Sequence, residues 1–134
     1  LKESPNPQDS FMSALHSDPN LHLALFPNRE IGFKMKFADD CNVSFLIKKS
    51  DNLDSAILSI IETTESEECR NKGYGSKTMK KIIELADKHG TTMHLIASPS
   101  GGMKMSEKSL RKWYSKFGFK AFDEFSQRMV RVPS

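Results

Sequence analysis

A glycine-rich, basic segment in the middle of the chain has the residue types that bind phosphate. The segment, ECRNKGYGSKTMKK (residues 68–81), lies between an acidic stretch and a pattern typical of a helix. Gly73 and Gly75 permit a tight turn or a close approach of the backbone to a bulky ligand. The free amides and the positive dipole end of a helix N-terminus bind phosphate oxygens. Positive charge around such a site would come from Arg70, Lys72 and Lys77.

Two common phosphate-binding loops do not match this segment. A Walker loop needs an earlier glycine and a Gly-Lys-Ser/Thr run, whereas GSKT displaces the lysine. A dinucleotide-binding fingerprint needs a third glycine where Thr78 stands. Taken alone, the two glycines are also consistent with a turn that tightens a strand–helix junction.

The two halves of the 134-residue chain carry opposite charge. Residues 1–69 hold 6 Lys+Arg against 12 Asp+Glu, a balance of −6, and residues 70–134 hold 14 against 5, a balance of +9, which gives the net charge of +3. We therefore expect the C-terminal half to bind an anionic ligand. Nucleic acid is a second candidate partner, but the aromatic residues there have helical and strand spacings rather than those of a stacking platform.

The composition is that of a soluble globular domain, with 37% hydrophobic and 28% charged residues. No apolar run approaches the length needed to span a bilayer. Cys41 and Cys69 have neither a metal-type nor a redox-type spacing. We expect a cytoplasmic protein with both cysteines reduced, no membrane partner and no metal site.

Hydrophobic periodicity predicts an α+β fold. Residues 31–37 alternate between apolar and polar side chains, as in a half-buried strand. The stretch SAILSIIETT is apolar on both faces, which predicts a central strand. Ile57 and Ile61 would lie on one face of it. Leu58 and Ile60 would lie on the other.

The order of the expected elements implies one parallel strand pair, because consecutive strand, helix and strand pair through a right-handed crossover. Residues 1–30 should form a loop segment with one short helix at 8–16. The remaining elements are expected at 43–49 (strand), 55–64 (strand), about 76–89 (helix), 91–98 (strand), 106–117 (helix), and 119–122 with 127–132 (a strand pair).

Two motifs resemble the GCN5-related N-acetyltransferases, the GNAT superfamily. RNKGYG matches the family's Arg/Gln-x-x-Gly-x-Gly/Ala signature between a strand and a helix, and WYSKFGF (residues 113–119) is similar to its Tyr-x-x-x-Gly-Phe ending of a later helix. The resemblance covers residues 31–132 and extends to small members encoded by phages and mobile elements, some of which modify protein lysines. It implies a mixed, mostly antiparallel sheet with a central parallel strand pair, flanked by helices.

The resemblance also implies acetyl-coenzyme A (acetyl-CoA) as cosubstrate, bound by residues 31–134. In the family, the backbone amides of this loop hold the pyrophosphate of acetyl-CoA. The positions that the resemblance assigns to cofactor binding are Thr64, Cys69, Arg70, Asn71, Lys72, Gly73, Tyr74, Gly75, Ser76 and Ser109.

The resemblance assigns Tyr114 as the general acid that protonates the departing thiolate. A tyrosine hydroxyl, with an ordinary pKa near 10, can do this when it is shielded from water. The alternative is structural, since Tyr114 shares an apolar helical stripe with Leu110 and Phe117. We expect Trp113 and Phe119 to be core residues.

Glu62 is the candidate base that deprotonates the amine. It follows Leu58 and Ile60 along one face of the expected central strand, so burial would raise its pKa. Two alternatives remain. His94 on the next strand has a suitable ordinary pKa. An acidic rim that attracts a cationic amine would be formed by Glu65, Glu67 and Glu68.

The sequence also departs from the family pattern. TTESEE stands where an apolar strand end and a proline are usual, and Ser106 or Ser109 would replace a frequent asparagine. The segment before Ile31 is short, so the acceptor pocket is either open or completed by the second subunit of a homodimer. We expect direct transfer to a primary amine, with a protein lysine or N-terminal amine preferred. The alternatives are a non-catalytic CoA-binding sensor or interaction module, and transfer to a small amine or an aminoacyl-tRNA.

Overall fold

The computed structural model describes residues 6–38, 40–63, 68–69, 72–97, 106–122 and 127–134. Its elements are α1 (Pro7–Ser17), β1 (Leu21–Leu25), β2 (Ile31–Ala38), β3 (Cys41–Lys49), β4 (Ser55–Thr63), α2 (Tyr74–Lys88), β5 (Thr92–Ile96), α3 (Glu107–Ser115), β6 (Lys120–Ala121) and β7 (Arg128–Arg131). None of these helices is long and apolar enough to cross a membrane.

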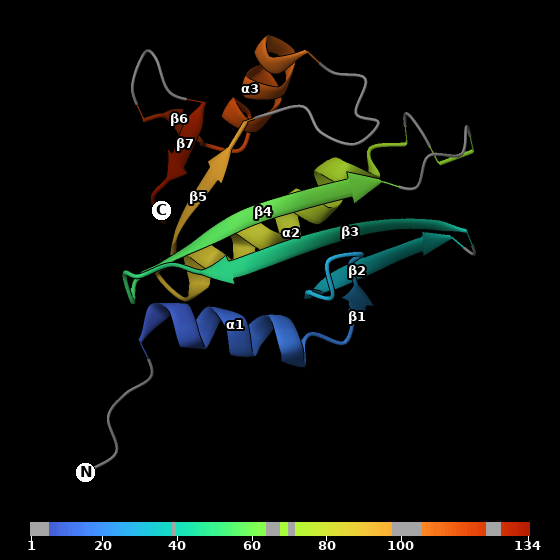
Figure 1. Cartoon of the computed structure of the whole chain (residues 1–134), viewed down its shortest axis with the longest axis horizontal. Coiled ribbons are helices and arrows are strands. Elements are labelled where there is room, and N and C mark those ends of the chain that lie inside the picture. Colours follow the sequence, from blue (N-terminus) through green and yellow to red (C-terminus); the bar gives the residue numbers. More distant parts are fainter. Residues whose placement is uncertain (1–5, 39, 64–67, 70–71, 98–105, 123–126) are drawn as a thin grey trace.

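The strands form one seven-stranded sheet in the order β1-β2-β3-β4-β5-β7-β6 (Figure 1). Only β4 and β5 pair in parallel, and α2 is the crossover between them. Every other neighbouring pair is antiparallel. The α+β class and the central parallel pair are therefore confirmed.

The N-terminal segment contains a strand that we did not expect. The short helix is confirmed as α1, which begins at a proline and is capped by the side chain of Asn6. After it, Leu21 to Leu25 pair in antiparallel register with residues 31–35 of β2. Only Leu21 of β1 is buried, so the segment lacks a buried apolar face of its own and depends on β2.

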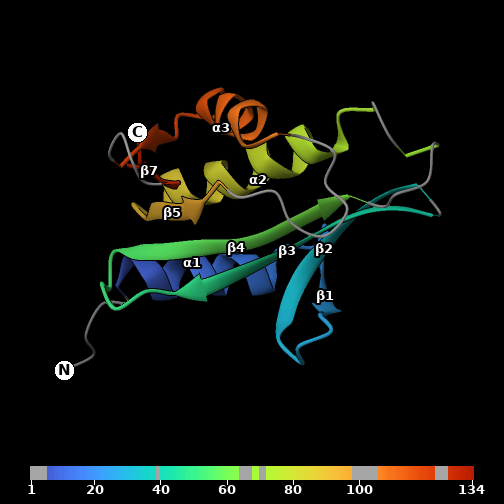
Figure 2. The same cartoon turned by 45° about the horizontal axis from the view of Figure 1, so that its top comes forward.

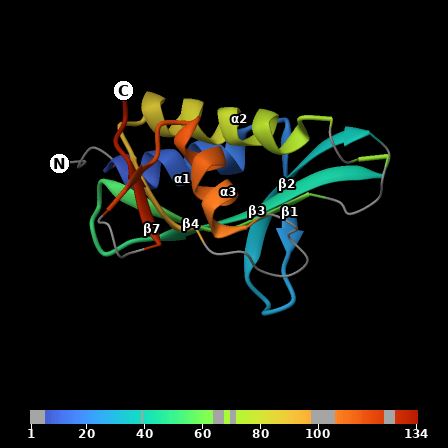
Figure 3. The same cartoon turned by 90° about the horizontal axis from the view of Figure 1, so that it is seen from above.

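The helices cover one face of the sheet. Figure 3 shows α1 and α2 running beside each other, and Figure 2 shows α3 next to α2. A Lys81–Asp18 ion pair of 2.7 Å joins α2 to the end of α1. The largest side chains buried between the helices and the sheet are Phe11, Phe45, Phe119, Leu15, Met79, Ile82, Met93, Leu95, Leu110 and Met129.

A β-bulge interrupts β4. Leu58 lies opposite Ile47 and Ile60 lies opposite Leu46, so Ser59 has no partner in β3. An extra residue in one strand reverses its alternation beyond that point. Leu58 and Ile61 therefore face the helices together, and our assignment of these residues to opposite faces was wrong.

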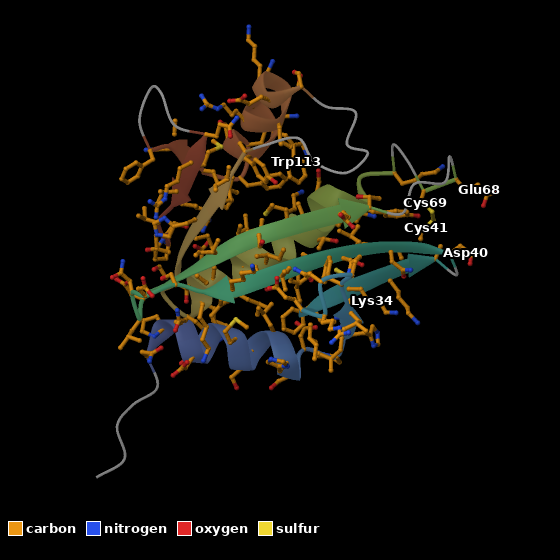
Figure 4. The ribbon with its side chains drawn as sticks, viewed as in Figure 1. Lys34, Asp40, Cys41, Glu68, Cys69 and Trp113 are labelled. Atoms are coloured by element: carbon orange, nitrogen blue, oxygen red, sulfur yellow. A yellow bond between two sulfur atoms is a disulfide. The ribbon has the colours of Figure 1, made fainter. Side chains whose placement is uncertain are left out.

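A disulfide joins Cys41 to Cys69, so the expectation of two reduced cysteines was wrong. The two residues are 28 positions apart in sequence and form no recognisable motif. The strand register explains their meeting: Val43 lies opposite Thr63, which sets the start of β3 beside the end of β4. Figure 4 shows Cys41 and Cys69 next to each other at this end of the sheet.

A buried ion pair joins β7 to α2. Arg131 donates to both carboxylate oxygens of Asp87, at 2.6 and 2.9 Å, and its Nε donates to the Phe117 carbonyl at 2.6 Å. Asp87→Ala would leave the guanidinium of Arg131, which is 7% exposed, without a counter-charge. We expect a loss of about 3 kcal/mol in the free energy of unfolding, measured by urea titration at pH 7.

The same pair predicts a pH dependence. Hydrogen bonds from Arg131 lower the pKa of Asp87 from its ordinary value of 3.8. A carboxyl with a lowered pKa stabilises the fold above its unfolded pKa, and this contribution disappears as the pH falls through the folded value. The Asp87→Ala deficit should therefore shrink below about pH 4. As a control, Lys49→Met removes an exposed pair with Asp9 and should cost less than about 1 kcal/mol. Equal losses in the two variants would contradict the assignment.

Candidate functional site

The parallel strands β4 and β5 separate at their C-terminal ends. Pairing runs from Ser55 opposite Thr92 to Leu58 opposite Leu95 and then stops. β4 continues to Thr63, and Figure 1 shows the two strands diverging. The bulge at Ser59 lies at the same point. No described strand pairs with the β5 side of β4 beyond Leu58, so backbone groups there can bind an extended ligand.

The N-terminus of α2 has no capping anion from the described chain. Gly73 is its N-cap, with a left-handed φ of 74°, and among the described residues no side chain accepts from the first-turn amides. No acidic residue lies in that turn either. In α1 and α3, by contrast, Asn6 and Ser106 cap the helix and Asp9 and Glu107 lie in the first turn. The amides and dipole of α2 are thus left for an external anion.

The first turn of α2 is also a point of close packing. A Cβ added at Gly75 would lie 3.6 Å from Thr63 Oγ1 and 3.7 Å from Trp113 Cζ2. The end of β4 and the helix α3 therefore both contact this turn. Trp113, expected in the core, is half-buried and lies on α3 (Figure 4). The sequence alone could not place Trp113 beside the first turn of α2, because its helical spacing is that of a core residue.

The predicted phosphate-binding residues are only partly described. Tyr74 stacks on Phe37 with ring centroids 4.5 Å apart, which anchors the turn to β2. Ser76 is half-buried, Lys72 and Lys77 are exposed, and Lys77 lies 5.8 Å from the Tyr74 ring. The side chain of Cys69 is committed to the disulfide, so its predicted contact with the cofactor would have to come from the backbone. Thr64, Arg70 and Asn71 lie outside the described residues.

Tyr114 is buried on α3. Its ring packs edge-on against Trp113 and Phe119, with centroids 5.1 and 5.8 Å away, and it is 5% exposed. Burial raises the pKa of its hydroxyl to about 12. Tyr114 is therefore protonated throughout the physiological range, as a general acid must be. Phe119 is a core residue, as expected.

The environment expected for Glu62 was wrong. Its side chain is exposed, and the bulge at Ser59 places it on the face of the sheet that points away from the helices, opposite Ser44 of β3. The carboxylate is therefore not desolvated. Among its acidic neighbours, Glu68 is exposed, and Glu65 and Glu67 lie outside the described residues.

His94 lies on the same face of the sheet as Glu62. It pairs with Ile57 of β4 and is half-buried. Burial lowers its pKa, and the charge of Arg128 lowers it further. Its Nδ1 is buried with no hydrogen-bond partner in the described part of the chain. His94 is therefore neutral at pH 7 and has a free ring nitrogen.

Ser106 and Ser109 form the N-terminal cap of α3. The Ser109 amide donates to Ser106 Oγ at 3.1 Å, and the two hydroxyls are also 3.1 Å apart. Ser106 is thus the N-cap residue of α3. Ser109 remains exposed, so its hydroxyl is accessible to a ligand.

Comparison with known proteins identifies the fold. The chain matches no protein-family model and no curated protein sequence. Several solved structures are similar to it in fold, among them the following three. The anti-CRISPR protein AcrVA5 is 19% identical with a TM-score of 0.54, over 74% of this chain and 96% of that one. The ribosomal-protein-S18-alanine N-acetyltransferase of Escherichia coli is 16% identical with a TM-score of 0.51, over 92% and 88%. A Bacillus subtilis acetyltransferase in complex with CoA is 18% identical with a TM-score of 0.50, over 81% and 80%. The chain therefore has the GNAT fold, as its two motifs predicted.

Proposed function

We propose that this chain is an N-acetyltransferase that transfers the acetyl group of acetyl-CoA directly to a primary amine. The observation that supports this most is a coincidence of three features. β4 and β5 separate just where β4 bulges, and the uncapped N-terminus of α2 follows the end of β4. The helix α3, which carries Tyr114, approaches the first turn of α2 through Trp113, whose Cζ2 lies 3.7 Å from a Cβ built at Gly75.

The residues fit acetyl-CoA in two respects. First, the side of Gly73 is open, since a Cβ built there meets no atom within 4 Å. A diphosphate can therefore approach the first-turn amides of α2. Second, the β5 side of β4 beyond Leu58 offers backbone hydrogen-bonding groups to the amide-containing arm of CoA. The Bacillus subtilis acetyltransferase with this fold was crystallised in complex with CoA, which is consistent with this fit.

Acetyl-CoA would supply a thioester whose C–S bond breaks as the C–N bond forms. Three proton transfers then remain for the protein to assist. The ammonium must lose one proton before it can attack as an amine, the nitrogen must lose a second once the C–N bond has formed, and the departing thiolate must gain one. Tyr114 would donate the proton to the thiolate, because burial keeps its hydroxyl protonated.

Glu62 would act on the amine side. An exposed carboxylate at the open end of the strand pair can attract a cationic amine and accept its proton through water. His94, whose pKa is lowered, lies on the same face of the sheet as Glu62 and is the alternative proton acceptor. Glu62 lies exposed on the sheet face that none of the described helices covers, which favours a protein amine over a small one.

The test is binding of acetyl-CoA measured by thermal unfolding. At about 100 times its dissociation constant, acetyl-CoA should stabilise the wild type by about 2.7 kcal/mol, a rise of about 10 °C in Tm. Gly73→Asp should abolish this rise, because its carboxylate would occupy the anion position at the α2 N-terminus.

Gly90→Asp is the matched control. Gly90 also has a left-handed φ, of 63°, and open space around it, but it lies just beyond the C-terminus of α2. Backbone strain and added charge are therefore the same in both variants. If Gly90→Asp loses the acetyl-CoA response as completely as Gly73→Asp, the turn is not the binding site.

A further inference from the structure

The two faces of the sheet are covered very differently. Phe33, Phe45 and Leu95 point toward the helices, and all three are at most 3% exposed. The alternating residues of the same strands point the other way, where none of the described helices packs. We call this second surface the open face.

The C-terminal half of the open face is apolar. The register places Ile57, His94 and Val130 in one row across β4, β5 and β7, and Ile96 in the next row. Ile96 is 66% exposed, Phe122 61% and Val132 68%. The Arg128 guanidinium lies 5.1 Å from the Phe122 ring, which ties the end of β6 to this patch. Exposed apolar side chains grouped on one face in this way are typical of interaction sites.

The rest of the open face is basic. The positive side chains on it are Lys34, Lys36, Lys48, Lys120 and Arg128. Lys34 is seen on β2 in Figure 4. The described acidic residues on or beside it are Glu62, Glu30 and Asp54, whose charge acts on His94, and Glu30 already pairs with Lys48 at 3.2 Å. A partner on this face therefore needs negative charge around an apolar centre.

The open face leads to the amine side of the proposed reaction. Glu62 belongs to it, and β4 and β5 separate next to it, beyond Leu58. Tyr114 is buried on the helix side of the sheet, and the α2 N-terminus follows the end of β4. A molecule seated on the open face would thus present an amine from the side opposite the cofactor.

We propose that the open face is the docking surface for an acidic protein, whose lysine or N-terminal amine is the acetyl acceptor. This rests on the proposed acetyltransferase function and names its substrate class. The patch around Ile96 and Val132 supplies apolar contact, and the lysines of β2 and β3 supply charge complementarity.

Two other occupants fit less well. A second copy of the chain, stacked face to face, would bring the lysines of both copies together, and like charges across an interface cost binding energy. A nucleic acid would match the positive charge. However, Phe122 is the single phenylalanine, tyrosine or tryptophan ring exposed on the described part of this face, and aliphatic side chains offer no platform for bases.

The proposal is tested by binding of a fluorescein-labelled, glutamate-rich 20-residue peptide that contains leucines and one lysine, followed by fluorescence anisotropy with CoA present. Lys34→Glu/Lys36→Glu should weaken binding about tenfold, and added salt should weaken binding to the wild type. The matched control is Lys80→Glu/Lys88→Glu, which makes the same charge change at exposed positions of α2 and should alter Kd less than twofold. A glutamine-substituted peptide should bind poorly.

Several results would overturn the proposal. One is the absence of peptide binding to the wild type, and another is an equal loss in both double variants. A 20-nucleotide RNA that binds more tightly than the peptide, with the same dependence on Lys34 and Lys36, would assign the face to nucleic acid instead. Failure of the proposed acetyltransferase function would give a different result. The peptide would still bind, but no thiol would be released from acetyl-CoA with any amine.

Discussion

Replacing Tyr114 with phenylalanine is expected to lower kcat for acetyl transfer by about 100- to 1,000-fold. The change removes one oxygen and leaves the ring contacts with Trp113 and Phe119 in place. Without the hydroxyl, the thiolate must take its proton from water. The loss should appear in kcat, with little change in KM for acetyl-CoA, in a coupled assay of thiol release against a panel of primary amines.

The pH profile sharpens this prediction. Burial raises the pKa of Tyr114 to about 12, so the wild-type enzyme should keep its acid protonated to at least pH 10. No fall in kcat from loss of this proton is expected below that pH. A basic limb with an apparent pKa near 8 or 9 would point to a different acid.

Phe117→Leu is the control for packing. Phe117 lies just after α3, is buried, and its ring contacts Trp113 with centroids 5.0 Å apart. Its truncation should lower the free energy of unfolding by about 1 kcal/mol and leave kcat within a few-fold. If Tyr114→Phe behaves like Phe117→Leu, Tyr114 is a core residue and the chain binds CoA without this route of catalysis.

Elements with a strong local signal were predictable from the sequence. In α3, Leu110, Tyr114 and Phe117 recur at helical spacing after the cap Ser106, and the structure buries all three. The predicted start of α2, at about residue 76, was two residues later than the observed start at Tyr74. Gly73 caps the helix from a left-handed conformation rather than with a side chain, so the sequence carries no capping signal there. The central parallel pair followed from the order of strand, helix and strand.

The face of Glu62 was not predictable, because it depends on the bulge at Ser59. In SAILSIIETT apolar residues occupy both faces, so a reversal of the alternation changes no hydrophobic pattern. The bulge therefore places Glu62 in an exposed environment, whereas we expected a buried one. Its role consequently shifts from a desolvated base to a solvent-linked group that attracts the amine.

The remaining errors concern pairing between distant segments. β1 gains its strand conformation from β2, and its exposed Leu23 and Leu25 carry no burial signal. Cys41 and Cys69 meet because β3 and β4 pair at their far ends. Neither fact is encoded within a short window of sequence.

Reduction of the Cys41–Cys69 disulfide is expected to lower the free energy of unfolding by about 3–4 kcal/mol. The bond closes a loop with a sequence separation of 28, and chain entropy gives about this value for such a loop. The measurement is urea unfolding with and without dithiothreitol. Cys41→Ser/Cys69→Ser should match the reduced wild type and show no response to dithiothreitol. A free-thiol assay of the unfolded, unreduced protein that finds two thiols would contradict the assignment.

The disulfide should also affect the cofactor site, because Cys69 lies between the end of β4 and the first turn of α2. The bond ties this connection to the start of β3, and the Cys69 sulfur also lies 3.5 Å from the Asp40 carbonyl. Reduction frees one end of the turn that we expect to hold the diphosphate, so acetyl-CoA must order it on binding. We therefore expect Kd for acetyl-CoA to rise about tenfold on reduction, measured by calorimetry at a temperature where the reduced protein is still folded. Gly73→Asp supplies the baseline without binding. An unchanged Kd would mean that α2 and β4 alone hold the turn in its binding conformation.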